Sequence, residues 1–154
     1  MSEILDSGER RTFDTGAVRD IQEGKGRCDL MPLHVACRIR SVGIGVDFVL
    51  EKLAQFQDDN DTAHLYAALD HFSRTAFGGC RETMLLEVAK HFEAGALKYG
   101  ENNWQKGLPV NCYIDSAVRH YLKYRRNDND EPHQRAFVWN LMCCIWEVDF
   151  HANS

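Results

Sequence analysis

Apolar residues recur every three or four positions over most of the chain, which is the spacing of one face of an α-helix. After a break at Gly43 and Gly45, one stripe is followed directly by another. The first stripe consists of Val46, Val49, Leu50, Leu53 and Phe56. The second consists of Leu65, Ala68, Leu69 and Phe72. Asn60 or Asp61 is placed to cap the second helix, and Gly78-Gly79 is placed to end it.

The second half of the chain continues the pattern in three segments. In segment 81–99 the predicted buried face consists of Leu85, Val88, Ala89, Phe92, Ala96 and Tyr99. Gly100 is typical of a helix C-terminus. The next segment has a basic exposed side and an apolar stripe of Ile114, Ala117, Val118, Tyr121 and Leu122. The last segment, 130–148, directs Phe137, Leu141, Cys144, Ile145 and Val148 inward.

The first 32 residues differ, because glycines interrupt every apolar period there. They predict an extended arm over residues 1–32, and Pro32 suits the first turn of a short helix. We therefore predict an all-α protein: a bundle of about five or six helices, with an extended N-terminal arm. Residues 33–150 are expected to form a single helical domain.

Charge and composition narrow the partners. The net charge of −5 and the pI of about 5.8 argue against long nucleic acids as partners. An acidic chain gains little free energy from the counterion release that drives such binding. A local basic pocket can still bind a small anion. The chain lacks both a run of about 18 apolar residues and an apolar leader near its start. We expect a cytoplasmic protein that does not engage a membrane.

The six cysteines do not suggest a metal site, because no two of them have the C-x₂₋₄-C spacing of zinc ligands. We expect reduced and mostly buried thiols.

The candidate metal site combines acids from two helices. Glu93 flanks the apolar stripe of its helix among small residues, and Asp130, Glu131 and His133 begin the last helix. Carboxylates from facing helices can hold Mg²⁺, with Mn²⁺ as an alternative, together with substrate phosphates. The competing interpretations are a rim glutamate for Glu93 and helix capping for the other acids. Glu93 and Glu131 are the candidate catalytic carboxylates.

The candidate substrate contacts are cations, aromatic rings and amides. They are Lys25, Arg27, Lys98, Tyr99, Asn103, Trp104, Arg119, His120 and Asn140. Lys25 and Arg27 lie in a Gly-Lys-Gly-Arg stretch suited to phosphates, although no P-loop is present. Arg119 lies four residues after Asp115, so a salt bridge is its alternative role. Asn140 shares a helix ridge with Asp130, His133 and Phe137, and a core amide there requires a partner, either structural or a ligand.

An ordered series of motifs resembles the phage and bacterial dATP/dGTP diphosphohydrolase family. The motifs are Phe13-Asp14-Thr15-Gly16-Ala17, Gly24-Lys25-Gly26-Arg27, Asp29-Leu30-Met31-Pro32, Gly95-Ala96-Leu97-Lys98-Tyr99, Asn103-Trp104-Gln105-Lys106-Gly107, Asp115-Ser116-Ala117-Val118-Arg119-His120 and Asp130-Glu131-Pro132-His133. The resemblance covers about residues 12–36 and 85–147.

This family is related to the MazG-like, all-α nucleoside triphosphate pyrophosphohydrolases. The resemblance implies Mg²⁺-dependent cleavage between the α and β phosphates, giving a monophosphate and pyrophosphate. It also implies a homo-oligomer, a dimer or tetramer, and a host-cytoplasm location if the protein is phage-encoded. MazG-like enzymes carry E-x-x-E and E-x-x-D pairs, whereas Lys90 stands three residues before Glu93. The resemblance therefore implies a remodelled metal site, and residues 38–84 are expected to be a family-atypical helical insertion.

Two function hypotheses follow. The first is a pyrophosphohydrolase acting on purine deoxynucleoside triphosphates. The second is a non-catalytic protein that binds or sequesters a nucleotide. The incomplete acidic pairs favour the second, and the combination of acids, cations and rings favours the first.

Overall fold

The computed structural model describes residues 8–40, 43 and 45–151. Six α-helices follow a short N-terminal hairpin in this part of the chain. They are α1 (Leu33–Ala36), α2 (Phe48–Asp59), α3 (Ala63–Ala76), α4 (Arg81–Tyr99), α5 (Val110–Arg125) and α6 (His133–Trp146). Short helical turns are η1 (Cys28–Leu30), η2 (Asn103–Lys106) and the π-helical η3 (Glu147–His151). The predicted all-α fold is confirmed.

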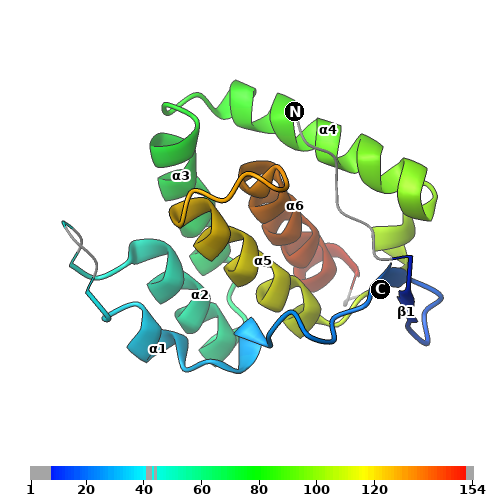
Figure 1. Ribbon diagram of the computed structural model, residues 1–154, viewed down its shortest axis with the longest axis horizontal. Coiled ribbons are helices and arrows are strands. Elements are labelled where there is room, and N and C mark those ends of the chain that lie inside the picture. Colours follow the sequence, from blue (N-terminus) through cyan, green and yellow to red (C-terminus); the bar gives the residue numbers. More distant parts are fainter. Residues whose placement is uncertain (1–7, 41–42, 44, 152–154) are drawn as a thin grey trace.

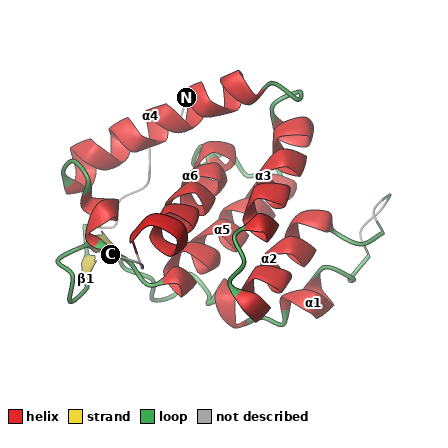
Figure 2. Ribbon diagram, turned by 180° about the vertical axis from the view of Figure 1, so that it is seen from behind, coloured by secondary structure: helices red, strands yellow, loops and turns green. Residues whose placement is uncertain are grey.

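Helices α5 and α6 lie side by side at the centre of the molecule, with α4 along one side and α1 and α2 on the other (Figures 1 and 2). Helix α3 packs on both α2 and α6. Each helix of 18 residues or more in the described part of the chain is too polar to cross a membrane.

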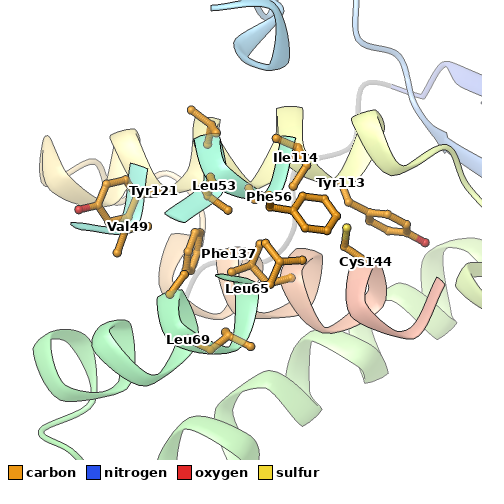
Figure 3. Packing of buried hydrophobic residues seen from close by; sticks show 14 of the residues in the cluster. Val49, Leu53, Phe56, Leu65, Leu69, Tyr113, Ile114, Tyr121, Phe137 and Cys144 are labelled. Carbon is orange, nitrogen blue, oxygen red and sulfur yellow. The ribbon is translucent and has the colours of Figure 1, made fainter. Parts of the chain in front are cut away.

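The apolar core lies where α2, α3, α5 and α6 meet. Leu53, Phe56, Leu65 and Phe137 converge there and are fully buried (Figure 3). Phe72 joins them and contacts the rings of Phe77, Tyr121, Tyr124 and Phe137. The stripes of the second, third, fifth and sixth helices therefore pack mostly as their periodicity predicts. Val46 and Leu122 are exceptions, because they are 51% and 38% exposed.

Polar contacts set the ends of α2 and α3. The Asp47 carboxylate accepts a hydrogen bond from the Leu50 amide at 3.1 Å and so caps α2. The same carboxylate accepts hydrogen bonds from the Tyr121 hydroxyl at 2.8 and 2.9 Å, which ties α2 to α5. Asn60 adopts the left-handed conformation that ends α2, and the Asp61 carboxylate accepts a bond from the Ala63 amide at the start of α3.

The N-terminal arm is more ordered than the predicted extended segment. Its strands β1 (Arg10–Thr12) and β2 (Val18–Asp20) pair antiparallel, with Arg11 opposite Arg19, and η1 then packs on α5. Three-residue strands with charged side chains carry too little apolar alternation to be recognised in a sequence. Residues 1–7 of the predicted arm lie outside the described residues.

Gly107 allows the arm to approach the loop after η2. The Thr15 hydroxyl donates a hydrogen bond to the Gly107 carbonyl at 2.5 Å. A Cβ atom at position 107 would lie 2.9 Å from the His151 ring, and the backbone φ of 108° is in the glycine region. The glycine is therefore required by both space and conformation.

Helix α4 is rotated from its predicted orientation. Its buried residues are Met84, Val88 and His91, whereas Leu85 and Ala89 are exposed. Apolar residues occur on every side of this helix, so its periodicity does not specify one face. The rotation moves Glu93 to the outside, about 160° from His91 by the helical step.

Candidate active site

A cavity of about 950 Å³ lies between α4, η2, α5, α6 and the arm. Six cationic side chains line it: Arg11, Arg19, Lys25, Lys98, Arg119 and Lys123. Four carboxylates also line it: Asp20, Glu101, Asp115 and Glu131. The excess of cations contrasts with the acidic character of the whole chain, so the local charge of the cavity would attract an anion.

Asp115 joins the arm to α5. Its carboxylate is 2% exposed and accepts hydrogen bonds from the Gln22 amide at 2.5 Å and from the Cys28 backbone amide at 2.6 Å. It also pairs with Arg119 at 2.7 Å, and Arg119 donates to the Gly26 carbonyl at 2.6 Å. The salt bridge considered for Arg119 therefore exists, and Arg119 lines the cavity as well.

Arg19 of β2 supplies the partner that a buried Asn140 requires. The Arg19 guanidinium donates to the Asn140 side-chain oxygen at 3.4 Å and to the Ser116 hydroxyl at 3.2 Å. It also lies over the rings of Tyr113 and Trp139, at 5.6 and 5.7 Å from their centroids. Asn140 donates in turn to the Ala136 carbonyl. The Asn140 side chain thus has a structural partner in the arm, and Asn140 also lines the cavity.

Asn103 has a similar role at the first residue of β2. Its side-chain nitrogen donates to the Val18 carbonyl at 2.8 Å, and its oxygen accepts from the Val18 amide at 2.9 Å. The Asn103 amide, predicted to contact substrate, is therefore hydrogen-bonded to the backbone of the arm, and Asn103 also lines the cavity.

A chain of hydrogen bonds links α5 to the start of α6. The His133 Nε2 lies 2.6 Å from the Asp130 carboxylate, and the two Nδ1 atoms of His133 and His120 lie 2.9 Å apart. Burial, then the neighbouring His133, lowers the pKa of His120 well below its usual value. The hydrogen bond from His133 is the main reason that the pKa of Asp130 is lowered.

Two groups near this chain could hold a metal ion. One consists of His120, Glu131 and His133, and the other of Asp128, Asp130 and His133. Ligand atoms in each group lie within 4.8 Å of one another. Three of the four predicted metal ligands therefore occur in these groups: His133 in both, Glu131 only in the first and Asp130 only in the second. Among the described residues a third group, Asp59, Asp61 and His64, lies at the turn between α2 and α3.

Glu93, the fourth predicted ligand, is exposed on α4 and is not among the residues that line the cavity. Helix α4 faces the cavity instead with His91, Phe92, Gly95, Ala96, Lys98 and Tyr99. The physical reason is the rotation of α4.

The remaining predicted contacts divide into two sets. Those that line the cavity are Lys25, Lys98, Tyr99, Asn103, Trp104, Arg119, His120, Glu131 and Asn140. Arg27 does not line it, and pairs with Asp29 at 2.8 Å. Lys25 pairs with Asp20 at 3.2 Å. The cationic groups of Arg10 and Lys98 each lie 5.0 Å from the centroid of the Tyr99 ring.

Sequence reasoning missed several residues of the cavity, notably Arg19, His91, Asp115 and Trp139. Arg19 and Asp115 act through contacts between segments about 90 residues apart, which no local pattern reveals. The signal for His91 is a polar residue within an apolar period, three residues after Val88.

No curated protein and no solved structure gives a significant match to the chain. A model of the family described as dATP/dGTP diphosphohydrolase, N-terminal, matches residues 74–153, which is just over half of the 154 residues. The match begins at the end of α3 and includes α4, α5 and α6, so it contains most of the helical wall of the cavity. The arm, with Lys25 and Arg27, lies outside it. The chain therefore belongs to the dATP/dGTP diphosphohydrolase, N-terminal, family.

Proposed function

We propose that the protein hydrolyses purine deoxynucleoside triphosphates, dATP and dGTP, to a monophosphate and pyrophosphate. Family membership supports nucleotide hydrolysis in general. The observation that supports the proposed substrates is the cavity, which combines cations that suit phosphates with aromatic side chains that suit a base. Its volume of about 950 Å³ is at the upper end of small-molecule sites.

The phosphate end of the cavity is assigned to the side of α5 that carries Arg119 and Lys123. Lys25 of the arm lines the same cavity, and Glu131 comes from the segment before α6. Lys123 lies 3.5 Å from Asp130, so this end also adjoins the metal-binding groups. A triphosphate bound here would have its negative charge opposed by these cations.

The donors present fit a divalent cation. Mg²⁺ commonly binds one or two carboxylates and completes its shell with substrate phosphates and water. Glu131, which lines the cavity, would supply one carboxylate from the first group, and Asp130 is the alternative carboxylate from the second. Both ring nitrogens of His133 already have partners, so its role is to orient Asp130 and His120. A bound cation would polarise a phosphoryl oxygen; Mg²⁺ is preferred, and Mn²⁺ would tolerate the adjacent imidazoles.

In the proposed reaction a water oxygen attacks the α-phosphorus. A new P–O bond forms, the bond from the α-phosphorus to the bridging oxygen breaks, and pyrophosphate leaves. Glu131 orients the water by accepting its hydrogen bond, and takes the proton that the water loses before passing it to solvent. Arg119 stabilises the charge that develops on the phosphoryl oxygens, and Asp115 holds Arg119 in place.

The direct test is a product assay. The purified protein is incubated with Mg²⁺ and each common NTP and dNTP, and the products are separated by anion exchange. We expect monophosphate and pyrophosphate from dATP and dGTP, with no turnover after EDTA treatment. Intact nucleotide carried through gel filtration without any product would instead favour the sequestering protein, which the position of Glu93 outside the cavity also favours.

We also propose that two copies associate through α4. The outward stripe of this helix consists of Leu86, Lys90, Glu93 and Leu97, and Leu86 and Leu97 are 70% and 85% exposed. In an antiparallel pair these leucines oppose each other and Lys90 opposes Glu93 of the partner subunit, so the stripe is complementary to itself. Lys90 also pairs with Glu87 within its own helix at 2.8 Å.

Light scattering after gel filtration tests this association. We expect a dimer for the wild type, a monomer for Lys90→Glu, and a restored dimer for Lys90→Glu combined with Glu93→Lys. A Lys90→Glu variant that remains dimeric would exclude this interface.

A further inference from the structure

Three residues that line the cavity each have a buried polar atom without a hydrogen-bond partner in the described part of the chain: Arg119 at the proposed phosphate end, and His91 and Trp139 on the α4–α6 side. Among the described residues, neither the His91 Nδ1 nor the Trp139 Nε1 has a hydrogen-bond partner, and both atoms are shielded from solvent. His91 is only 9% exposed, and both side chains line the cavity. A buried polar atom that lacks a hydrogen bond costs about 1–3 kcal/mol, so a pair of them beside a cavity indicates a ligand that supplies the bonds.

These two residues belong to an aromatic group that forms one part of the cavity. The His91 and Trp139 rings lie 5.5 Å apart, and Phe92 lies 5.9 Å from Trp139 and 5.6 Å from Trp104. Phe92 and Trp104 line the cavity as well. Flat apolar rings next to a few polar atoms are the usual surroundings of a nucleobase, which stacks by its faces and is read along its edge.

We infer that His91 and Trp139 read the edge of the purine base. This inference rests on the proposed function and assigns the base to the α4–α6 side of the cavity. The Trp139 N–H can only donate, so it suits a ring nitrogen of a purine. A neutral His91 has one nitrogen that donates and one that accepts.

The neutral state of His91 bears on which purines fit. Burial is the first cause of its lowered pKa, of about 3, and nearby Arg135, Arg19 and Lys98 add to it. The ring is therefore uncharged at neutral pH. Because its proton can occupy either nitrogen, the same side chain accepts from a 6-amino group or donates to a 6-oxo group. One residue thus accommodates both adenine and guanine, and we expect the smaller pyrimidine ring, attached at the same sugar, to extend less far toward these two atoms.

The test is the ratio of kcat/KM for purine to pyrimidine deoxynucleotides, measured within one protein sample. His91→Phe keeps a planar ring and removes both nitrogens, and we expect the purine preference to fall about tenfold or more. Trp139→Phe, which removes only the N–H, is expected to reduce it similarly. His91→Gln retains a donor and an acceptor and is expected to keep most of the preference.

His71→Phe is the matched control, because His71 lies on α3, stacked on Phe48 and outside the cavity lining. Melting temperatures identify any variant that fails to fold. If His91→Phe fails to fold, the purine preferences of Trp139→Phe and His91→Gln test the inference. A purine preference that survives both His91→Phe and Trp139→Phe would overturn the inference.

Binding of the α,β-methylene analogues of dATP and dCTP, which cannot be cleaved, separates this failure from failure of the proposed function. A wild-type protein that prefers the dATP analogue but cleaves no nucleotide would refute hydrolysis, and loss of that preference in His91→Phe would still support base reading. A wild-type protein that cleaves purines while His91→Phe keeps the preference would refute only the base-reading inference.

Discussion

The contact between α3 and its neighbours and the contact between the arm and α5 hold the molecule together in different ways. The first is made of buried apolar side chains such as Phe72, Leu65 and Phe137. The second depends on individual polar groups, of which Asp115 and Arg19 make the most bonds. Apolar packing tolerates many combinations of side chains and appears in the sequence as a periodic pattern. The polar contacts of the arm instead depend on particular partners that lie far apart in the chain. The core builds the bundle, and these polar contacts hold the arm against α5, where it forms part of the cavity wall.

The largest effect is expected from Phe72→Ala, because this fully buried ring contacts four other rings. Such a truncation removes apolar burial and leaves a cavity, and typically costs about 3–5 kcal/mol of the free energy of unfolding. Urea denaturation followed by circular dichroism measures it. A loss below about 1 kcal/mol would mean that α3 is not held by this cluster.

A smaller but more local effect is expected from Asp115→Asn. The amide cannot accept from Gln22, Cys28 and Arg119 as the carboxylate does, and we expect a loss of about 1–3 kcal/mol. The arm should become sensitive to trypsin while the helices remain resistant. Asp70→Asn is the control, since its pair with Arg74 is exposed on α3. Equal trypsin resistance of the arm in both variants would contradict this role of the polar contacts.

The smallest effect is expected from Tyr121→Phe, which removes one hydroxyl and keeps the apolar contacts of the ring. The bond to Asp47 joins α5 to the cap of α2, and hydrogen bonds to charged groups contribute about 1.5–3 kcal/mol at most. We expect a loss at the lower end of that range in thermal or urea unfolding. Tyr66→Phe, at a 54% exposed position, should change nothing. Equal stability of the two variants would show that this bond adds nothing to the apolar contact.

The sequence was sufficient to predict the bundle because the stripes at Leu53, Leu65 and their neighbours each have one apolar face, while the helix of Phe137 is apolar on most sides and lies buried at the centre. It was insufficient for α4, where leucines occur on several sides and tertiary contacts choose which face is buried. The buried face of α4 determines which of its residues line the cavity, because it places Glu93 outside the cavity and His91 in its wall. The residue types of the site were largely predictable, since nine of the predicted residues line the cavity, among them Arg119 and Glu131. The bonds of Arg19 and Asp115 were not, because they depend on where the arm folds.

The central claim is that the chemistry occurs in the cavity beside Glu131 and not on the outer face of α4. Comparing Glu131→Gln with Glu93→Gln in the dATP and dGTP hydrolysis assay tests it most directly. Each substitution removes one carboxylate charge with little change in shape. We expect Glu131→Gln to lower kcat by about 10²-fold or more while nucleotide binding persists, and Glu93→Gln to retain turnover. Loss of turnover in Glu93→Gln with full activity in Glu131→Gln would contradict the account.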